Sequence, residues 1–348
     1  MRKKRIAAAM KKIMAVLSSF FVLTALVGCT KEQNTPFKMQ DFVMDTTLTQ
    51  TIYSQNAKEI SAEVLEALKE SDKRLSAFND ESEISQINSA KGRGTSVSEG
   101  TFELIKKSLE FCEKSEGVFD ISVFPLSRIW KDAINDGTLP DNEQILNALS
   151  LVDYRKIELN EEKSSVKLAE NMALDLGAVA KGAALSRIYE IYKENSVSGA
   201  ICSIGNSAML IYKNKGGQPF KIGLRNPFEN GQNSLFAAVS LENCTVSTSG
   251  GYERYAEIDG EKYHHILDTK TGYPAKNSMA SATVIASDGA ESDFLSTRLF
   301  VLGFEKAKEV CEKENISAVL VSTDKKVYVS LSLNDRIEIT DKSFERIN

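Results

Sequence analysis

Hydrophobic residues along this chain follow two different periods, one typical of helices and one typical of strands. Across 56–75 the apolar residues Ile60, Val64 and Leu68 recur four positions apart, the spacing of a helix that buries one face. From residue 151 onward the pattern changes to short apolar runs separated by turn residues, which predicts strands. We therefore expect a fold that contains both helices and sheets.

The periodic segments define a set of expected elements. The helices expected are Asn56–Leu75, Thr101–Cys112, Ala178–Lys193, Gly289–Leu302 and Glu305–Lys313. The strands expected lie within Asp41–Tyr53, at Met172–Asp175, Gly199–Ile204, Ala208–Tyr212, Phe220–Leu224, Leu235–Leu241 and Ala280–Ala286, and in the hairpins Arg155–Leu159 with Ser165–Leu168, Tyr252–Ile258 with Lys262–Leu267, and Ala318–Ser322 with Lys326–Leu331. An Asp-Gly pair joins the second hairpin and is a strong turn signal. Glu113–Pro140 has weak periodicity, and we assign no element there.

The composition is that of an ordinary globular protein. The 348 residues are 42% hydrophobic and 26% charged with 6 Pro, which excludes a disordered or fibrous chain. No linker rich in Pro, Gly or Ser interrupts 39–340, and no internal repeat is present. We predict a single α+β domain of mixed β-sheets with packed helices over residues 39–345, with a two-lobed arrangement left open.

The N-terminal residues have the pattern of an export signal. Six bases in 1–28 precede the apolar run Ile13–Gly28, whose sixteen residues are fewer than the roughly 20 needed to span a bilayer. Leu-Val-Gly-Cys at 26–29 resembles a bacterial lipobox. We expect 1–28 to be a cleaved lipoprotein signal peptide, Cys29 to carry lipid such as palmitate, and 29–38 to be a flexible tether, with a short uncleaved anchor as the alternative. Either would hold the domain, lipid-anchored in the first case, at the extracytoplasmic face of a bacterial cell membrane.

The net charge and the cysteines exclude some further kinds of partner and site. Without residues 1–28 the chain has 37 bases against 48 acids, a balance that argues against nucleic acid as a partner. The remaining cysteines are widely separated and lack any C-x-x-C pair; they are Cys112, Cys202, Cys244 and Cys311. We expect them to be small buried residues rather than a disulfide framework or a zinc site.

The only two histidines are neighbours, His264 and His265, in the second strand of the Asp-Gly hairpin. Successive strand residues point to opposite faces, so at most one of them faces any given cleft, which disfavours a metal site built from both. One histidine can still serve as a general base, because its ordinary pKa is close to neutral. Asp268, three residues later, could orient that imidazole or bind a cation.

Two further clusters carry candidate chemistry. Asp293, Ser296 and Thr297 have the i, i+3, i+4 spacing of one helix face, and a carboxylate with two hydroxyls suits Mg²⁺; a capping or solvated polar face is the alternative. At 174–182 a strand ends at Asp175 and a helix begins with Lys181 one turn in, which favours an anionic ligand. This segment matches neither a Walker A loop nor G-x-G-x-x-G. Ser247–Gly251 could form a phosphate nest or an ordinary turn.

Taken in order along the chain, these segments resemble the ApbE family, the FAD:protein FMN transferases. The motifs are Asp175–Gly182, Ser247–Gly251, His265–Asp268 with Lys270-Thr271-Gly272, and Asp293–Thr297, and the resemblance runs from about Met44 to Leu302. It implies a single ApbE-like (T-fold-like) domain. It also implies a Mg²⁺-dependent enzyme that binds FAD, transfers its FMN moiety to a Thr or Ser hydroxyl of a target flavoprotein, and releases AMP.

The resemblance also implies roles for individual residues. The FAD-binding positions would be Met44, Phe78, Val118, Phe119, Asp120, Asp175, Lys181 and Ile266, and the metal positions Ala178, Asp293, Ser296 and Thr297. The catalytic base would be His265 or, as the alternative, Asp268. Phe78 stands where many members have a Tyr that packs on the flavin. Asp45, the single glycine of Ile204-Gly205-Asn206, and Thr269 also depart from the common pattern.

The partners implied are FAD and acceptor flavoproteins with an Asp-Gly-x-Ser/Thr-Gly-Ala-Thr-type motif, such as membrane or extracytoplasmic electron-transfer subunits. Three alternatives stay open: an FAD pyrophosphatase that gives FMN and AMP, a substrate-binding lipoprotein of a transporter, and a non-catalytic flavin-binding redox lipoprotein. Free FMN as the product would indicate the pyrophosphatase. The absence of AMP release with FAD and acceptor would indicate a non-catalytic protein.

Overall fold

The computed structural model describes residues 35–214, 216–229 and 234–348. The chain divides into two units, 1–35 and Pro36–Asn348, and only the second is described below. The predicted signal peptide, Cys29 and most of the predicted tether lie outside the described residues. Within the described part of the chain, no helix combines the length and the apolar character needed to cross a membrane.

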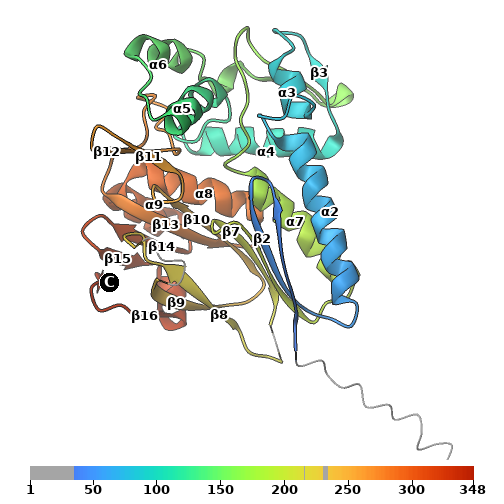
Figure 1. The fold of residues 1–348 in the computed structure, drawn as a ribbon, viewed down its shortest axis with the longest axis vertical. Coiled ribbons are helices and arrows are strands. Elements are labelled where there is room, and N and C mark those ends of the chain that lie inside the picture. Colours follow the sequence, from blue (N-terminus) through green and yellow to red (C-terminus); the bar gives the residue numbers. More distant parts are fainter. Residues whose placement is uncertain (1–34, 215, 230–233) are drawn as a thin grey trace, which may run out of the picture. The chain divides into compact units, whose positions relative to one another are not determined.

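A large mixed sheet forms the centre of the described unit (Figure 1). Within the described residues its nine strands lie in the order β1-β2-β6-β7-β10-β13-β14-β15-β17, and neighbours are antiparallel except for the parallel pair β15–β17. The strands are β1 (Phe37–Val43), β2 (Thr46–Tyr53), β6 (Gly199–Ile204), β7 (Ala208–Lys213), β10 (Cys244–Gly250), β13 (Met279–Ala286), β14 (Ala318–Ser322), β15 (Lys326–Val329) and β17 (Glu345–Arg346).

Four helices pack against the sheet: α2 (Ala57–Leu75), α7 (Ala180–Glu194), α8 (Gly289–Leu302) and α9 (Phe304–Glu314). The predicted apolar stripe of α2, which includes Ile60, Val64 and Leu68, is buried together with Leu185 and Ile188 of α7. Helix α8 is buried along nearly its whole length, since it packs on β10 and β13 and contacts α7 and α9. A helix surrounded in this way lacks a polar outer face, so its polar residues need partners inside the protein.

A second, three-stranded sheet covers part of the large sheet. Its order is β16 (Ile337–Ile339), β9 (Leu235–Leu241), β8 (Phe220–Arg225). Phe236 and Val239 of β9 share a buried apolar cluster with Val319 and Val327 of the large sheet. The 3₁₀ turn η3 (Leu331–Arg336) leads into β16 and adds Leu333 to this cluster.

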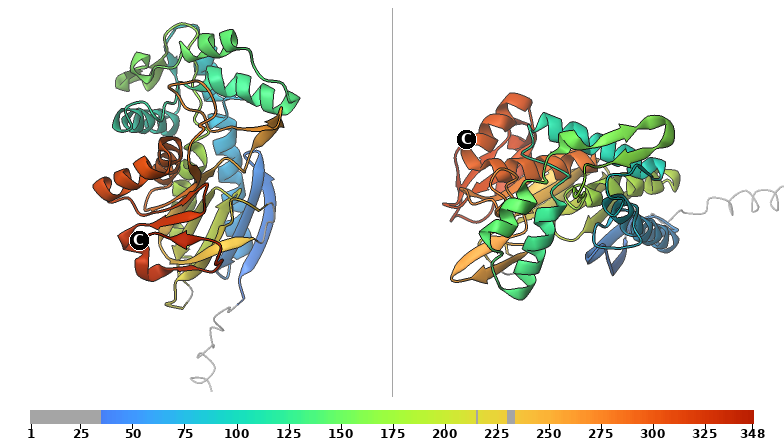
Figure 2. Two further views of the ribbon diagram at one scale, coloured as in Figure 1. Left: turned by 90° about the vertical axis from the view of Figure 1, so that its left-hand side faces the viewer. Right: turned by 90° about the horizontal axis from the view of Figure 1, so that it is seen from above.

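The remaining helices group at one end of the unit, as Figures 1 and 2 show. They are α3 (Glu83–Asn88), α4 (Glu99–Lys114), α5 (Phe124–Asp136) and α6 (Asn142–Leu149), with the small sheet β3 (Thr95–Ser96), β5 (Ser165–Lys167), β4 (Glu158–Asn160), the 3₁₀ turns η1 (Tyr154–Lys156) and η2 (Glu161–Lys163), and the hairpin β11 (Tyr255–Ile258) with β12 (Glu261–His264). Phe111 of α4 stacks on Phe294 of α8 with ring centroids 4.3 Å apart. The two parts therefore share one hydrophobic core, and the α+β prediction agrees with this architecture.

Several expectations about local structure are corrected. The expected strand within Asp41–Tyr53 is a hairpin, because Met44 and Asp45 form a two-residue turn with φ 55° at both positions. The expected strand Met172–Asp175 makes only one bridge, from Ala173 to Val123. Within Ser247–Gly251, residues 247–250 belong to β10 and only Gly251 lies in a turn; pairing of β10 with β7 and β13 overrides the turn preference of Ser and Gly.

The four cysteines of the described residues are free thiols. Three of them are buried in apolar clusters, as expected, and Cys244 is half-buried. Burial raises the pKa of the Cys202 thiol to about 12, so this group stays protonated at neutral pH. These residues contribute packing rather than reactive thiolates.

Candidate active site

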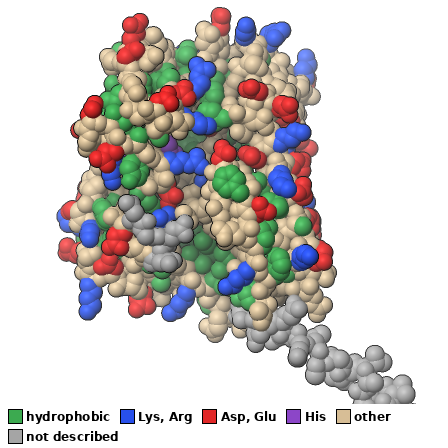
Figure 3. Space-filling view, in the orientation of Figure 1, with side chains coloured by type: hydrophobic (Ala, Val, Ile, Leu, Met, Phe, Trp, Pro, Cys, Tyr) green, Lys and Arg blue, Asp and Glu red, His purple; other side chains and the backbone are tan. Residues whose placement is uncertain are grey.

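A cavity of about 580 Å³ lies between the large sheet and the α3–α6 end of the unit. Figure 3 shows this face of the molecule hollowed near its centre, with Lys and Arg side chains around the hollow. The volume is in the range of small-molecule sites. The cavity is lined by all the expected FAD, metal and base residues except Asp268, namely Met44, Phe78, Val118, Phe119, Asp120, Asp175, Ala178, Lys181, His265, Ile266, Asp293, Ser296 and Thr297.

Asp293 is the buried carboxylate at one side of the cavity. Its residue is 7% exposed, and both carboxylate oxygens accept hydrogen bonds: Oδ1 from the Ser247 hydroxyl at 2.5 Å and Oδ2 from the Gly182 backbone N–H at 2.7 Å. Burial raises the pKa of Asp293, against the charge of Lys181 and these two hydrogen bonds, which lower it. The site thus holds a carboxylate in a place where its negative charge is costly without a positive partner.

Hydroxyl groups extend this oxygen-rich patch along α8 and β10. Ser249 Oγ lies 2.9 Å from Ser296 Oγ and 3.3 Å from Thr297 Oγ1. The period of two in a strand places Ser247 and Ser249 on the same face of β10, toward α8. The i, i+3, i+4 spacing on α8 supplies the other half of the patch, as the sequence predicted.

The chemistry of these donors fits a hard divalent cation. One buried carboxylate, neighbouring hydroxyls and the backbone carbonyl of Ala178, which lines the same cavity, are oxygen ligands of the kind that Mg²⁺ prefers. Among the described residues, no group of three or more His, Cys, Asp or Glu side chains is arranged to hold a metal. Such a cation would therefore take few protein ligands and complete its shell with water or substrate oxygens, which is usual for Mg²⁺.

The start of α7 is held against α8 by two glycines. A Cβ on Gly182 would lie 2.0 Å from the carbonyl oxygen of Gly289, and a Cβ on Gly289 would lie 2.0 Å from that of Gly182. No other residue fits at either position without a backbone shift. This close approach brings the Gly182 N–H to Asp293 and places Lys181 beside the buried carboxylate.

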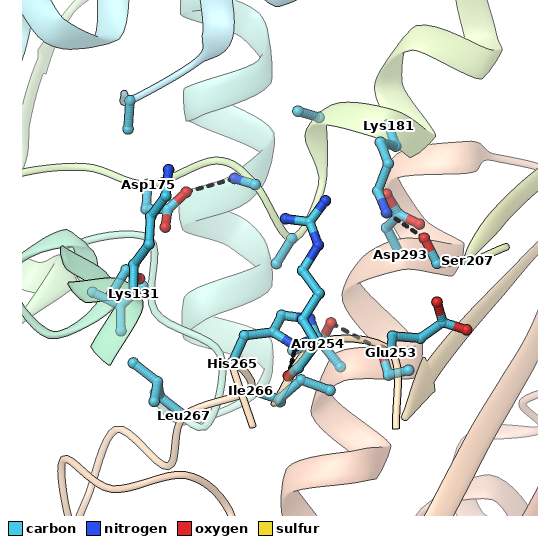
Figure 4. Close-up of a pocket in the computed structure, with 18 of the residues that line it drawn as sticks. Lys131, Asp175, Lys181, Ser207, Glu253, Arg254, His265, Ile266, Leu267 and Asp293 are labelled. Carbon is cyan, nitrogen blue, oxygen red and sulfur yellow. Dashed lines mark hydrogen bonds between the residues drawn. The ribbon is translucent and has the colours of Figure 1, made fainter. Parts of the chain in front are cut away.

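Lys181 provides a positive charge near the first turn of α7, and Asp175 holds the turn that precedes this helix. Burial lowers the pKa of Lys181, whereas the charge of Asp293 raises it; the ammonium group donates a hydrogen bond to Ser207. Asp175 Oδ1 accepts the Gly177 N–H at 2.8 Å and so shapes the turn before the helix. Figure 4 shows Lys181 and Asp293 on one side of the cavity and Asp175 on the other.

His265 faces the cavity with one ring nitrogen uncommitted. Its backbone N–H and its Nδ1 both lie 3.2 Å from the carbonyl oxygen of Arg254. A carbonyl can only accept, so Nδ1 carries the proton and the lone pair of Nε2 is available. The ring opens onto the cavity but is surrounded by protein atoms, and this desolvation lowers the pKa of His265 to about 4. A neutral imidazole with a free Nε2 can remove a proton at neutral pH.

The side chains of His264 and Asp268 form contacts within the protein that stabilise the local fold. The His264 ring meets Phe300 edge to face, and its Nε2 lies 3.1 Å from the carbonyl oxygen of Ala275. The Asp268 carboxylate accepts the Lys270 N–H at 2.9 Å, and its carbonyl accepts the Gly272 N–H at 2.8 Å. Asp268 therefore closes a turn and is not among the cavity residues, so the geometry favours His265 of the two candidate bases.

The opposite end of the cavity is aromatic. Phe78 is 45% exposed, packs on Phe124 with centroids 5.1 Å apart, and lies beneath Lys131, whose Nζ is 3.4 Å from the ring centroid. Met44 reaches the same cavity from a left-handed turn, a conformation that non-glycine residues rarely adopt. An exposed ring at a cavity wall is suited to stack on a planar ligand.

The carboxylate of Asp120, in the segment before α5, is hydrogen-bonded within the cavity wall. Both oxygens of Asp120 are occupied, Oδ1 by the N–H and hydroxyl of Ser122 and Oδ2 by the Tyr154 N–H at 3.0 Å. Burial raises the pKa of Asp120, and these hydrogen bonds lower it. These hydrogen bonds hold Asp120 in the wall that Val118 and Phe119 also line, and its expected contact with FAD stays a prediction.

The family assignment follows from comparison with known proteins. The ApbE family matches residues 44–320. This chain belongs to the ApbE family. An FAD:protein FMN transferase of Treponema pallidum is 30% identical over 328 residues, which cover 88% of this chain and 90% of that protein. One from Klebsiella pneumoniae is 31% identical over 300 residues, with 85% and 92% covered.

A solved structure agrees with this ApbE assignment. The crystal structure of the ApbE protein from Thermotoga maritima matches with a TM-score of 0.79 at 29% identity, covering 85% of this chain and 97% of that one. The predicted family and the α+β fold class are confirmed. The names of the relatives agree with the predicted enzyme class.

Some residues of this ApbE-family cavity were not found from the sequence. Lys131, Ser207, Glu253, Arg254 and Trp130 all line it. Trp130 closes the α5 side, where its Nε1–H donates to the Gly272 carbonyl at 2.7 Å. The charged ones lie in loops or in the segment to which no element was assigned, where a single basic or acidic residue has no spacing that marks it. The one signal available was the position of Arg254 just before the Asp-Gly hairpin, after which His265 follows.

Proposed function

We propose that this protein is an FAD:protein FMN transferase that acts on exported or membrane flavoproteins. In the reaction, the oxygen of an acceptor Thr or Ser hydroxyl attacks the phosphorus of the FMN half of FAD. The bond from that phosphorus to the AMP phosphate breaks, AMP leaves, and the hydroxyl proton passes to a base. The observation that carries the proposal is the cavity, in which an oxygen-rich patch with Lys181 and a neutral His265 occur together.

Each group of cavity residues has a separate role in the proposed reaction. Lys181 and the first turn of α7 bind and neutralise phosphate oxygens, which is the main requirement of phosphoryl transfer. Phe78 and Met44 form the flavin end. His265 Nε2 removes the proton from the acceptor hydroxyl, whose high pKa makes unaided attack slow at pH 7. Asp293, Ser296, Thr297 and the carbonyl of Ala178 would hold Mg²⁺, which supplies charge neutralisation at the diphosphate when bound.

The test is mass spectrometry of an acceptor peptide. The full chain in detergent is mixed with FAD, Mg²⁺ and a peptide carrying the Asp-Gly-x-Thr-Gly-Ala-Thr sequence, and the peptide is expected to gain FMN less one water while AMP appears. Asp293→Asn keeps the size of the side chain but removes its charge. We expect transfer to fall roughly 100-fold or more in this variant, with FAD binding weakened only in part.

The matched control is Glu305→Gln, which removes an equal charge from an exposed position on α9 outside the cavity. Its transfer rate should equal that of the wild type. Full activity of Asp293→Asn with normal folding would contradict the metal assignment. FMN and AMP released in solution without labelling of the peptide would instead favour an FAD pyrophosphatase, since water can take the place of the acceptor hydroxyl in the same site.

The proposed location is the extracytoplasmic face of the cell membrane. It is supported by the sequence alone: a basic and apolar segment before Leu-Val-Gly-Cys, with Cys29 as the lipidated residue. The described domain begins with β1 at Phe37, eight positions after Cys29. A lipid anchor there would keep the cavity near membrane-bound acceptors such as electron-transfer subunits.

A further inference from the structure

Arg254 extends into the cavity from a wall that is separate from α7 and α8. It lies in the loop between β10 and β11, and Figure 4 shows its guanidinium group directed toward the middle of the cavity, between Lys131 and Asp175 on one side and Lys181 and Asp293 on the other. The residue is exposed. Its side chain is therefore open to a ligand that enters the site.

The guanidinium group has few partners within the protein. Its hydrogen bond to the backbone carbonyl of Asp45 is long, 3.4 Å, and no carboxylate in the described part of the chain forms an ion pair with it. The neighbouring Glu253 is held by Arg225 at 2.9 Å instead. Most of the five N–H donors of Arg254 are thus available, together with a full positive charge.

The backbone carbonyl of Arg254 is hydrogen-bonded to His265, so the two residues are held next to each other. The Arg254 carbonyl accepts the backbone N–H and the Nδ1–H of His265, each at 3.2 Å. The charge of Arg254 contributes to the lowered pKa of both His265 and Lys181. The guanidinium group therefore acts electrostatically on the base and on the phosphate-side lysine.

We propose that Arg254 binds phosphate oxygens of the FAD diphosphate next to His265, from a different wall of the cavity than Lys181 and Asp293. This inference rests on the proposed function, in which FAD is the substrate. A planar guanidinium offers two parallel N–H groups to two oxygens, and such charge-assisted bonds are directional. Held in this way, the diphosphate would be contacted from both sides, and the phosphorus of the FMN half would be presented to the hydroxyl that His265 deprotonates.

The test compares a ligand that contains the diphosphate with one that lacks phosphate. Binding of FAD and of riboflavin to the full chain is measured by isothermal titration calorimetry, in EDTA and without acceptor. Arg254→Met should weaken FAD binding roughly 10-fold or more and leave riboflavin binding unchanged. Arg254→Lys should recover part of the FAD affinity, because it restores the charge without the fork.

The control is Lys262→Met, which removes one positive charge from β12 of the neighbouring hairpin, outside the cavity. It should bind both ligands like the wild type. The assignment is overturned if Arg254→Met binds FAD normally, or if it loses FAD and riboflavin affinity equally. A wild-type chain that binds no FAD would contradict the proposed function itself, whereas unchanged binding in Arg254→Met contradicts only this inference.

Discussion

At the scale of single residues, surroundings decide which of two like side chains can do chemistry. His264 and His265 are adjacent and were predicted to share a strand, but β12 ends at His264 and His265 is the first residue after it. His264 is tied to the Ala275 carbonyl and to the Phe300 ring, whereas His265 faces the cavity with Nε2 free. The prediction that at most one of the two faces the cavity agrees with the structure, but which one does so depends on packing that the sequence does not display.

The lowered pKa of His265 can be measured directly. We expect its imidazole to titrate near pH 4, below the ordinary 6.5, because desolvation by the surrounding protein atoms and the charges of Arg254 and Lys181 disfavour the protonated form. The base is then unprotonated throughout the neutral range, and transfer should not decline between pH 7 and 6 through protonation of His265. NMR of protein with ¹³C-labelled histidine, recorded from pH 8 down to about pH 3, follows this titration past its midpoint.

Assignment of the NMR signals is simple because the chain has two histidines. The His265→Gln variant removes one signal, and the signal that remains belongs to His264. Burial also lowers the pKa of His264, so the titrations of both histidines must be followed to tell them apart. A His265 titration at pH 6.5 or above would show that the ring is solvated and that the proposed state of the base is wrong.

The candidate site was predictable where its residues follow a helical spacing. Asp293, Ser296 and Thr297 lie on one face of α8 as their i, i+3, i+4 positions require. Arg254 and Lys131 were missed because no spacing distinguishes a lone base in a loop, or on the polar side of a helix, from an ordinary surface residue. Their positions become visible only when the chain has folded around the cavity.

At the scale of elements, the contact between α7 and α8 positions the oxygen-rich patch. Gly182 and Gly289 let the two backbones touch, and the Gly182 N–H then reaches Asp293 at 2.7 Å. Side chains larger than hydrogen would separate the helices. The distance between the phosphate-binding turn and the carboxylate is therefore set by backbone atoms rather than by flexible side chains.

Gly182→Ala should lower both stability and transfer. The new methyl group would lie 2.0 Å from a backbone oxygen, so the helices must shift, at a cost of about 1–3 kcal/mol in the free energy of unfolding. Urea unfolding measures this cost. Gly94→Ala is the control, because its Cβ would meet only the Ser165 hydroxyl at 3.8 Å and its backbone is not left-handed. A Gly182→Ala protein as stable and active as Gly94→Ala would contradict the proposed role of the contact.

Some of the observed helices were predicted from the sequence and others were missed. The long periodic helices were found within a few residues: Asn56–Leu75 is α2 (Ala57–Leu75), and Gly289–Leu302 is α8. Helices α5 and α6 were missed, although their end signals are present: Pro in the first turn and Gly137 after the end of α5, and an Asp141–Gln144 capping box at α6. Both helices are amphipathic, and their buried residues pack together with Leu267, so the expectation of weak periodicity over Glu113–Pro140 was wrong.

At the scale of the whole molecule, the cavity lies where the helical end meets the sheet, and one core continues beneath both. The stacked rings of Phe111 and Phe294 link α4 to α8, so the α3–α6 end is not an independent lobe. The sequence left one or two lobes open, since no linker marks a boundary. A shared core predicts that the described domain unfolds in a single cooperative step rather than in two.

Membrane attachment is a property of the full chain that can be tested apart from catalysis. Cys29→Ser should move the protein from the membrane fraction to the soluble fraction of cells, since the lipid that a cysteine accepts supplies the anchor. Immunoblots of fractionated cells measure the distribution. Cys202→Ser, at a buried position in the domain, serves as the comparison. Retention of Cys29→Ser in membranes would favour an uncleaved apolar anchor instead.

Trp130 gives the protein an intrinsic optical probe. It is the only tryptophan of the chain, and its indole stands in the wall of the cavity, fixed by the Gly272 carbonyl. Isoalloxazine absorbs light in the range where tryptophan emits, so a flavin in the cavity would quench this emission by resonance energy transfer. The fluorescence of the unlabelled protein thus reports the filling and emptying of a single place, with no background from tryptophans elsewhere.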